Sequence, residues 1–349
     1  MGSLFDGIGV FPLSATRNGI TPVWASEIEK APVSITKRHF PGMAHLGDVT
    51  KLNGGDIPPV SVITFGSPCQ NLSTIGWRTG LAGEESGLFY QAIRIIKEMR
   101  CATNGKYPTI AVWENVMGAL SSSDRNDYRA VLAAFADAEI PMPLTGRWAY
   151  AGMVRGGRAD ISWRLMDARY WGEPPPPQRR RRIFVVADFG GERSGEILFK
   201  PRGLHEYTAP CGDGGNTAAD GNRILIDEAG GSLPIVHPFQ YRRMRGMAKE
   251  KDQTRFTTSF GKPDDPFPTL LASGVNMFAL WYGGDYENGV IRYLTPTEGE
   301  RLMCLPEGWT EYGHDGKRIS DGARYKAIGN AIALPCAEYI MAGIAEVLS

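Results

Sequence analysis

Two periodic patterns alternate along the first 187 residues. The apolar runs at 60–66, 109–115 and 182–189 are rich in β-branched residues and end in polar residues or glycine, which is typical of buried parallel strands. Between them, residues 87–100 and 126–140 place apolar side chains three and four positions apart, as amphipathic helices do. The pattern predicts a doubly wound α/β sheet, whose ligands bind outside the carboxyl ends of the strands.

The pattern changes after residue 187. Residues 188–275 are rich in glycine, proline and aspartate and have little helical periodicity, which predicts a separate, smaller, loop-rich domain. A local basic patch in its middle contains Arg242, Arg243 and Arg245. Beyond it, Thr-Pro-Thr-Glu from residue 295 is a good helix start, and the apolar tail predicts a C-terminal helix.

Composition narrows the class of protein. The 349 residues are 42% hydrophobic and 22% charged, which is ordinary for a globular protein of one or two domains. The formal net charge is +0, so binding to a polyanion requires local clusters of cations. The five cysteines lie far apart and no histidine sits near them at zinc-ligand spacing, so we expect neither disulfides nor a metal site. No run of about 18 apolar residues and no leader occurs, which predicts no membrane span and a cytoplasmic location.

Glycines and carboxylates follow the first strands. Gly7 and Gly9 permit a tight turn against a helix N-terminus, and Glu27 lies about twenty residues further on, where a carboxylate accepts ribose hydroxyls. Asp48 follows the third strand and is available to a base or ribose edge. Together these residues indicate a cofactor that contains adenosine. The alternative is a structural turn and a surface glutamate.

The fourth strand leads into Gly-Ser-Pro and then Cys69. A thiol there becomes a nucleophile if backbone amides or cations stabilise its thiolate, although an isolated cysteine is more often a small buried hydrophobe. Glu114 directly follows another apolar strand, and strand alternation predicts that Arg180 and Arg182 point to one side. A thiol, an acid and two planar cations would then converge beside the cofactor. The alternative for the arginine run is a solvated basic turn.

Eight motifs in order resemble those of the cytosine-5 DNA methyltransferases of bacteria and phages. They are FDGIG, SEIEK, GDVT, GSPCQ, ENV, QRRRRIF, RYLTPTEGERLMCLP and IGNAIALP. The resemblance covers nearly the whole chain apart from 188–275, where only Pro-Thr-Leu at 268–270 is similar. It implies a Rossmann-like methyltransferase fold, with a catalytic domain of residues 1–187 and 321–349 that binds S-adenosylmethionine. Residues 188–320 would form the target-recognition domain and hinge.

The resemblance also implies roles for the catalytic residues. Cys69 would attack carbon 6 of a flipped-out cytosine, and carbon 5 of the covalent adduct would accept the methyl group. Glu114 would bond ring nitrogen 3 and the exocyclic amine, and Arg180 and Arg182 would hold the base carbonyl and its neighbours. Asn115 is expected to brace the strand end.

For the cofactor, the resemblance implies that Phe5 stacks on the adenine, Glu27 binds the ribose and Asp48 takes the adenine amine. The other implied cofactor residues are Gly7, Ile8, Gly9, Ile28, Val49, Pro68, Leu88, Asn330 and Ala331. The implied DNA contacts are Thr74, Ile75, Arg242, Arg243, Arg245 and Thr269.

Three departures from the family pattern matter. Ser3 stands where the family has an aspartate, and we expect Asp6 to pair with the cofactor's ammonium group instead. Only four residues precede Phe5, which predicts a short first strand. Extra prolines before the arginine run are expected to stiffen or displace Arg180.

The leading hypothesis is a monomeric methyltransferase of double-stranded DNA, with a companion restriction endonuclease as a further expectation. One alternative is an RNA cytosine-5 methyltransferase with the same chemistry. The other is a catalytically silent DNA-binding protein.

Overall fold

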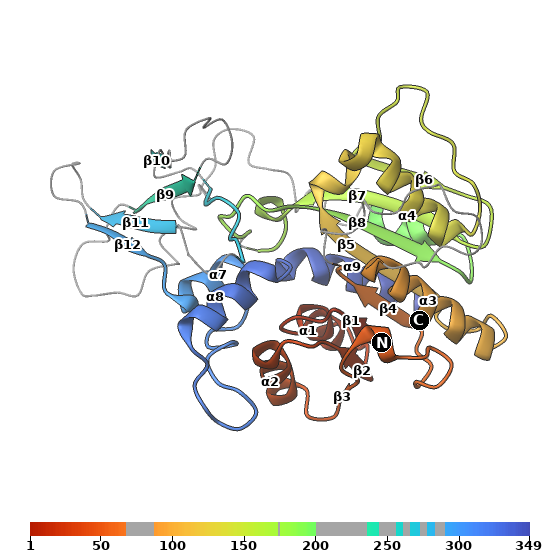
Figure 1. Ribbon diagram of the computed structural model, residues 1–349, viewed down its shortest axis with the longest axis horizontal. Helices are drawn as coiled ribbons and strands as arrows, with labels where there is room; N and C mark the ends of the chain where they lie inside the picture. The colour runs from red at the N-terminus through yellow and green to blue at the C-terminus, as the bar shows by residue number, and fades with distance from the viewer. Residues whose placement is uncertain are drawn as a thin grey trace, which may run out of the picture. The chain divides into compact units, whose positions relative to one another are not determined.

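The computed structural model describes residues 1–67, 87–173, 175–199, 236–243, 256–260, 266–272, 278–282 and 290–349, and contacts divide it into two compact units (Figure 1). The first unit comprises Met1–Met166, Arg181–Arg202 and Cys336–Ser349. The second comprises Asp167–Arg180 and Gly203–Pro335. These bounds differ from the predicted domains at 167–180, 188–202 and 321–335. The division into a catalytic domain and a target-recognition domain stays a prediction.

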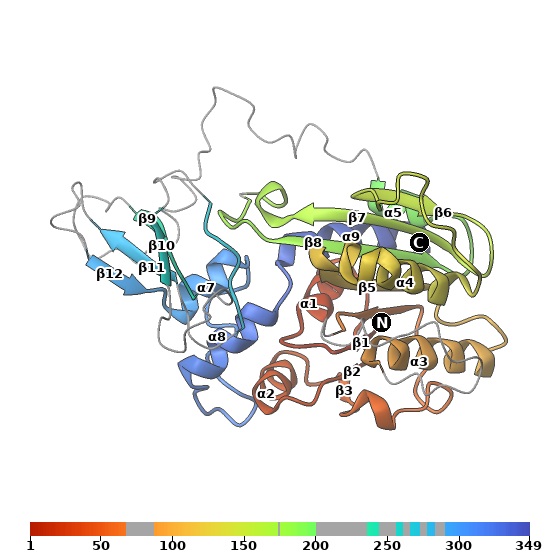
Figure 2. The ribbon, with the colours of Figure 1, turned by 45° about the horizontal axis from the view of Figure 1, so that its top comes forward.

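The described part of the first sheet has eight strands in the order β3-β2-β1-β4-β5-β8-β7-β6 (Figure 2). Their bounds are β1 Gly2–Leu4, β2 Trp24–Ser26, β3 Ala44–His45, β4 Val62–Phe65, β5 Ile110–Val116, β6 Ala151–Val154, β7 Asp160–Asp167 and β8 Arg181–Asp188. The first five pair in parallel. β8 runs antiparallel to β5, so the prediction of a parallel strand at 182–189 was wrong in direction. A continuous apolar run indicates that a strand is buried on both faces, but it does not indicate whether the strand is parallel or antiparallel to its neighbour.

Helices connect the parallel strands as the periodicity predicts. The helices are α1 Val10–Arg17, α2 Lys30–His39, α3 Leu88–Ala102, α4 Asn126–Ala136, α5 Ser194–Phe199 and α9 Leu334–Leu348, with 3-10 turns η1 Val49–Lys51, η3 Met117–Leu120, η4 Ser122–Arg125 and η5 Ala168–Tyr170. The predicted helix at 126–140 ends early because Asp137 adopts a left-handed conformation, with φ 51°. The predicted short first strand is confirmed, since β1 has three residues.

The core of the first unit lies on both faces of the sheet. On one face, Phe65 and Trp113 pack with Phe89 of α3 and Phe135 of α4 in one hydrophobic cluster. The alternate strand residue Val112 is also fully buried, so the opposite face is covered as well. Burial on both faces explains why these strands read as continuous apolar runs.

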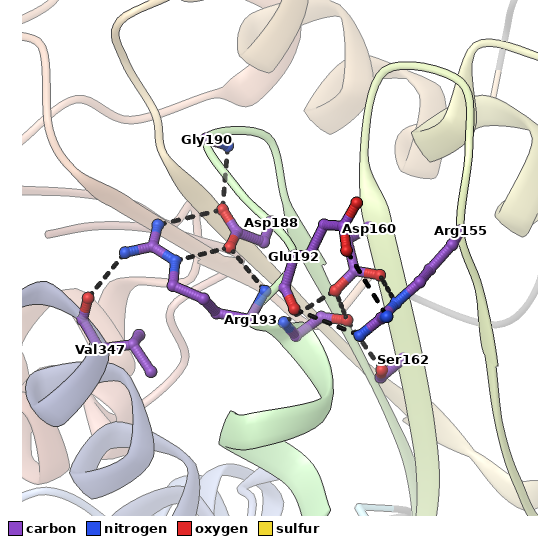
Figure 3. Close-up of polar contacts among 9 residues, drawn as sticks. Arg155, Asp160, Ser162, Asp188, Gly190, Glu192, Arg193 and Val347 are labelled. Atoms are coloured by element: carbon purple, nitrogen blue, oxygen red, sulfur yellow. Dashed lines mark hydrogen bonds and ion pairs between the residues drawn. The ribbon is translucent and has the colours of Figure 1, made fainter.

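A polar network connects α9 with the edge of the sheet at which the parallel strands, such as β5, begin (Figure 3). Asp188, which is fully buried, accepts a hydrogen bond from Arg193 Nε at 2.9 Å, and Arg193 Nη1 donates to the carbonyl of Val347 at 2.7 Å. Beside it, Asp160 accepts from the backbone N–H of Ser194 at 3.0 Å, at the start of α5. Asp188 pairs with the first residue of β5, so this network lies at the end of the sheet opposite Glu114.

The described part of the second unit contains an antiparallel sheet that the sequence pattern did not predict. Its strand order is β10-β9-β11-β12, with β9 Val236–Arg243, β10 Phe256–Phe260, β11 Phe278–Tyr282 and β12 Val290–Tyr293. The helices α7 Pro296–Leu302 and α8 Asp321–Asn330 follow. The predicted helix start at residue 295 is confirmed, because Thr295 and Glu298 form a reciprocal capping box.

No single helix in the described ranges is long and apolar enough to cross a membrane, and the bent pair α8 and α9 passes only by length and composition. Side chains of α9, such as Ile340 and Ile344, are fully buried in the protein. Within the same ranges no group of acidic, histidine and cysteine side chains could hold a metal ion, and the described cysteines form no disulfide.

Candidate active site

The strand order reverses direction between β1 and β4, which places their carboxyl ends at the switch point where ligands bind in such sheets. The loop after β1 turns sharply there: Phe5, Gly7 and Gly9 all have positive φ angles of 53°, 58° and 77°. Glycine adopts positive φ angles without strain, whereas phenylalanine does so at a cost in energy. The fold therefore holds the backbone of Phe5 in an unusual conformation. Gly9 is also the N-cap of α1.

Glu27 organises the same loop. Its Oε2 accepts from the backbone N–H of Gly7 at 2.9 Å, and its Oε1 accepts from Ile28 N at 2.7 Å and Glu29 N at 2.9 Å. A carboxylate has about four acceptor positions, so these bonds leave capacity for a further donor such as a ribose hydroxyl. Glu27, the residue predicted to bind the ribose, is therefore in direct contact with the predicted glycine loop.

Asp48 follows β3 and caps the short helix η1. Its Oδ1 accepts from the backbone N–H of Thr50 at 3.0 Å and from the Thr50 hydroxyl at 2.8 Å. These hydrogen bonds lower the pKa of Asp48, the backbone bond being the larger cause. An ionised carboxylate held in this way can accept a hydrogen bond from an exocyclic amine through its second oxygen.

Asp6 differs from these carboxylates because both of its oxygens are buried. Burial raises its pKa from the ordinary 3.8 to about 7; the hydrogen bond of Ser3 to this carboxyl acts against the shift, and the charge of Glu27 adds to it. A buried carboxyl group in this state is strongly stabilised by a cation. The group therefore fits the ammonium of a bound amino-acid moiety.

The remaining predicted cofactor residues fall into different environments. Ile8 and Val49 are buried, at 1% and 4% exposure, while Ile28 is 72% exposed beside Glu27. Leu88 begins α3 and packs on the core. Asn330 and Ala331 belong to the second unit, at the C-terminal end of α8. Pro68 lies outside the described residues.

Glu114 and Arg182 form a close ion pair at the carboxyl end of β5. Arg182 Nε lies 3.0 Å from Glu114 Oε1, and the two side chains are 15% and 12% exposed. Antiparallel pairing of β8 with β5 sets Arg182 opposite Val116, which brings the guanidinium alongside Glu114. A Cβ on Gly66, at the exit of β4, would lie 3.1 Å from Glu114 Oε2. Glycine at this position thus leaves room for the carboxylate beside the strand that leads to Cys69.

Arg180 does not follow the alternation that the sequence suggested. β8 begins at Arg181, so Arg180 precedes the strand, and its buried guanidinium donates to the carbonyls of Leu270, Gly329 and Ala331 in the second unit. A buried guanidinium requires acceptors, and backbone carbonyls supply them here. The expectation that Arg180 and Arg182 point to one side is therefore corrected. Arg180 orders the segment that contains the predicted cofactor residues of α8.

The predicted DNA contacts are only partly described. The backbones of Arg242 and Arg243 pair with β10 in the second sheet. The Thr269 hydroxyl donates to the carbonyl of Arg179 at 2.6 Å. Cys69, Thr74, Ile75 and Arg245 lie outside the described residues, and their roles stay predictions.

Sequence reasoning missed the contacts made by Ser67, two residues before Cys69. The indole N–H of Trp113 donates to Ser67 Oγ at 3.1 Å, and Asn115 Nδ2 donates to the Ser67 carbonyl at 3.1 Å. The second contact agrees with the expectation that Asn115 braces the strand end. Strand alternation places Trp113 and Asn115 on one face, and that signal was present in the sequence.

Comparison with solved structures identifies the fold class of this chain. The chain resembles the solved structures of the Schizosaccharomyces pombe Dnmt2 methyltransferase (TM-score 0.60, 16% identity) and the Entamoeba histolytica methyltransferase EhMeth (TM-score 0.60, 14% identity). Both comparisons cover 100% of this chain and 98% of the other. The first unit therefore has the Rossmann-like fold of methyltransferases.

The family follows from the sequence. Residues 1–193 and 230–346 match the C-5 cytosine-specific DNA methylase family, and the chain belongs to that family. It is 25% identical to the Type II methyltransferase M.BsuFI of Bacillus subtilis, over 98% of this chain and 71% of that protein. It is also 25% identical to a DNA N-6-adenine-methyltransferase of Escherichia phage P1, over 97% of this chain but 60% of that protein. The enzymes of this family methylate carbon 5 of cytosine in DNA, and the covalent adduct at carbon 6 is their mechanism.

Proposed function

We propose that this chain transfers a methyl group from S-adenosylmethionine to carbon 5 of a cytosine flipped out of double-stranded DNA, with Cys69 as the nucleophile. The observation that carries the assignment is the ion pair of Glu114 and Arg182, which lies beside the exit of β4. A second support is the loop after β1, which holds the buried Asp6 carboxyl.

Each residue has a definite task in the proposed reaction. The Cys69 thiolate forms a bond to carbon 6, and the electron pair of the 5,6 double bond moves into the ring. Glu114 takes up a proton from solvent as the base binds, and in this protonated form it donates a hydrogen bond to ring nitrogen 3 and offsets the developing negative charge. Arg182 orients Glu114 and faces the base carbonyl. After methylation of carbon 5, loss of its proton to a base allows the Cys69–carbon 6 bond to break and restores the thiolate.

The residues around the first strand fit S-adenosylmethionine, which supplies an electrophilic methyl group when bound. Glu27 retains acceptor capacity for ribose hydroxyls, and Asp48 retains one carboxylate oxygen for the adenine amine. Asp6 would hold the ammonium group. Ile28 offers an exposed apolar side chain beside Glu27, and apolar contact with the adenine ring is its proposed role.

The wider setting follows from the relatives. Type II methyltransferase names support a restriction-modification context, so we propose a companion endonuclease for this chain too. The monomeric state and the cytoplasmic location stay predictions. Arg242, Arg243, Arg245 and Thr269 are the proposed contacts of the second unit with DNA.

The test is covalent trapping by the purified full chain. Duplex DNA that contains 5-fluorocytosine blocks the final proton loss, so wild-type protein with S-adenosylmethionine is expected to form an adduct that survives denaturation. Cys69→Ser, with a nearly isosteric side chain, is expected to form none. Mass spectrometry of unmodified DNA and RNA, each incubated with the protein and S-adenosylmethionine, then shows which base and which nucleic acid are methylated. Methyl groups only on adenine, or only on RNA, or no methylation with fresh cofactor would each contradict the proposal.

A further inference from the structure

Two described residues that flank 68–86 in the sequence, Ser67 and Phe89, contact the same indole ring, that of Trp113. Ser67, directly before the segment, accepts a hydrogen bond at Oγ from the Trp113 N–H at 3.1 Å. Phe89, shortly after the segment, packs edge-on against the same indole, with ring centroids 5.6 Å apart and planes at 72°. We call Ser67, Trp113 and Phe89 the loop base. These residues come from three different elements: the exit of β4, the middle of β5 and the first turn of α3.

Every member of the loop base is buried. Trp113 is 0% exposed, Phe89 3% and Ser67 4%. Asn115 Nδ2 adds a second hydrogen bond, to the Ser67 carbonyl, from the same strand face. Ser67 is therefore held through both its side chain and its backbone, in a setting where water cannot replace a lost partner.

We propose that Trp113 is a positioning residue for the nucleophile, acting through the hydrogen bond from its indole N–H to Ser67. The inference rests on the proposed function, because it takes Cys69, two residues beyond Ser67, as the attacking group. Attack on carbon 6 requires the sulfur at near contact distance and in line with the ring face, and a displacement of about 1 Å can cost about a hundredfold in rate. The two hydrogen bonds fix Ser67, which is two residues before Cys69 in the sequence. The indole ring itself completes the packing with Phe89, so its N–H and its ring make separable contributions.

The variants separate the hydrogen bond from the packing. Trp113→Phe keeps an aromatic ring against Phe89 and removes the donor. Ser67→Ala removes the acceptor and leaves the ring untouched. The double variant removes both buried polar groups together, so it leaves neither donor nor acceptor without a partner.

Trp163→Phe is the matched control. Trp163 is also buried, at 5% exposure, and its indole N–H donates to the carbonyl of Ala149 at 2.9 Å. Its ring contacts are with Tyr128, at 5.9 Å between ring centroids, and with Trp148, at 6.1 Å. The control therefore reports the general effect of losing one buried indole hydrogen bond.

Two measurements test the proposal. The first is the single-turnover rate of adduct formation on 5-fluorocytosine DNA, together with the Kd for S-adenosylmethionine. We expect Trp113→Phe and Ser67→Ala each to slow adduct formation about tenfold or more with cofactor affinity unchanged, and the double variant to be no slower than the slower single variant. Trp163→Phe is expected to keep the wild-type rate.

The second measurement is the alkylation rate of Cys69, followed by peptide mass spectrometry, which requires no methyl transfer. Absence of an adduct with the wild-type chain would overturn the proposed function, while a change of alkylation rate in Trp113→Phe but not in Trp163→Phe would still support the positioning role. Equal effects of Trp113→Phe and Trp163→Phe, or effects of Trp113→Phe and Ser67→Ala that multiply in the double variant, would overturn the positioning role. If Trp113→Phe fails to fold, Ser67→Ala gives the same test.

Discussion

Replacing Asp6 by asparagine should change stability and cofactor affinity in opposite directions. In the protein without cofactor, burial raises the Asp6 pKa from 3.8 to about 7, so the folded state binds its proton more tightly than the unfolded state. Stability from this group is therefore fully present below about pH 4 and is lost as the pH rises to about 7. Because one pKa unit corresponds to 1.36 kcal/mol, the loss is on the order of 4 kcal/mol. Asp6→Asn removes the buried charge and should be more stable than wild type at pH 7.5, with little difference at pH 4.

Cofactor binding should show the complementary effect. An ammonium group beside Asp6 favours the ionised carboxylate, so binding releases the proton that Asp6 carries below pH 7. The affinity of the wild-type chain for S-adenosylmethionine should fall up to tenfold for each pH unit below 7, whereas Asp6→Asn should bind more weakly at pH 7.5 and show no such slope.

Two titrations suffice to test this reasoning. Urea unfolding at pH 4, 5.5 and 7.5 gives the stability difference between wild type and Asp6→Asn, and calorimetry from pH 5.5 to 7.5 gives the two affinity profiles. Parallel affinity profiles would refute the pairing of Asp6 with the ammonium group. Equal stability differences at every pH would refute the raised pKa.

Three further predictions concern the ion pair and Arg180. Gly66→Ala places a methyl group 3.1 Å from Glu114 Oε2, so we expect a loss of methylation rate of about tenfold or more with the unfolding midpoint nearly unchanged. Arg182→Met leaves Glu114 without its guanidinium and should lower the single-turnover rate about a hundredfold, equivalent to about 2.7 kcal/mol. Arg180→Met leaves three carbonyls without their buried donor, so urea unfolding should show a loss of about 3 kcal/mol. A stable but inactive Arg180→Met would instead support the original catalytic assignment.

Local patterns predicted much of the fold. The helices α3, α4 and α9 and the strands β4 and β5 lie where periodicity placed them, because apolar spacing within one element depends only on that element. The Thr295 capping box was equally readable, since donor and acceptor are three residues apart. Sequence patterns assigned Glu27 and the glycine loop to one cofactor, and the structure adds a hydrogen bond from Gly7 N–H to Glu27.

The sequence by itself thus determined where α3, α4, α9, β4 and β5 lie and which strand ends carry polar chemistry. Only the tertiary structure decided the direction of β8, the separate environments of Arg180 and Arg182, and the meeting of Ser67 with Trp113. The reason is physical: periodicity reports that a side chain is buried, but its partner is set by long-range strand pairing. A buried guanidinium or indole N–H requires an acceptor. The residue that supplies this acceptor is far away in the sequence, as Leu270 is from Arg180 and Ser67 is from Trp113.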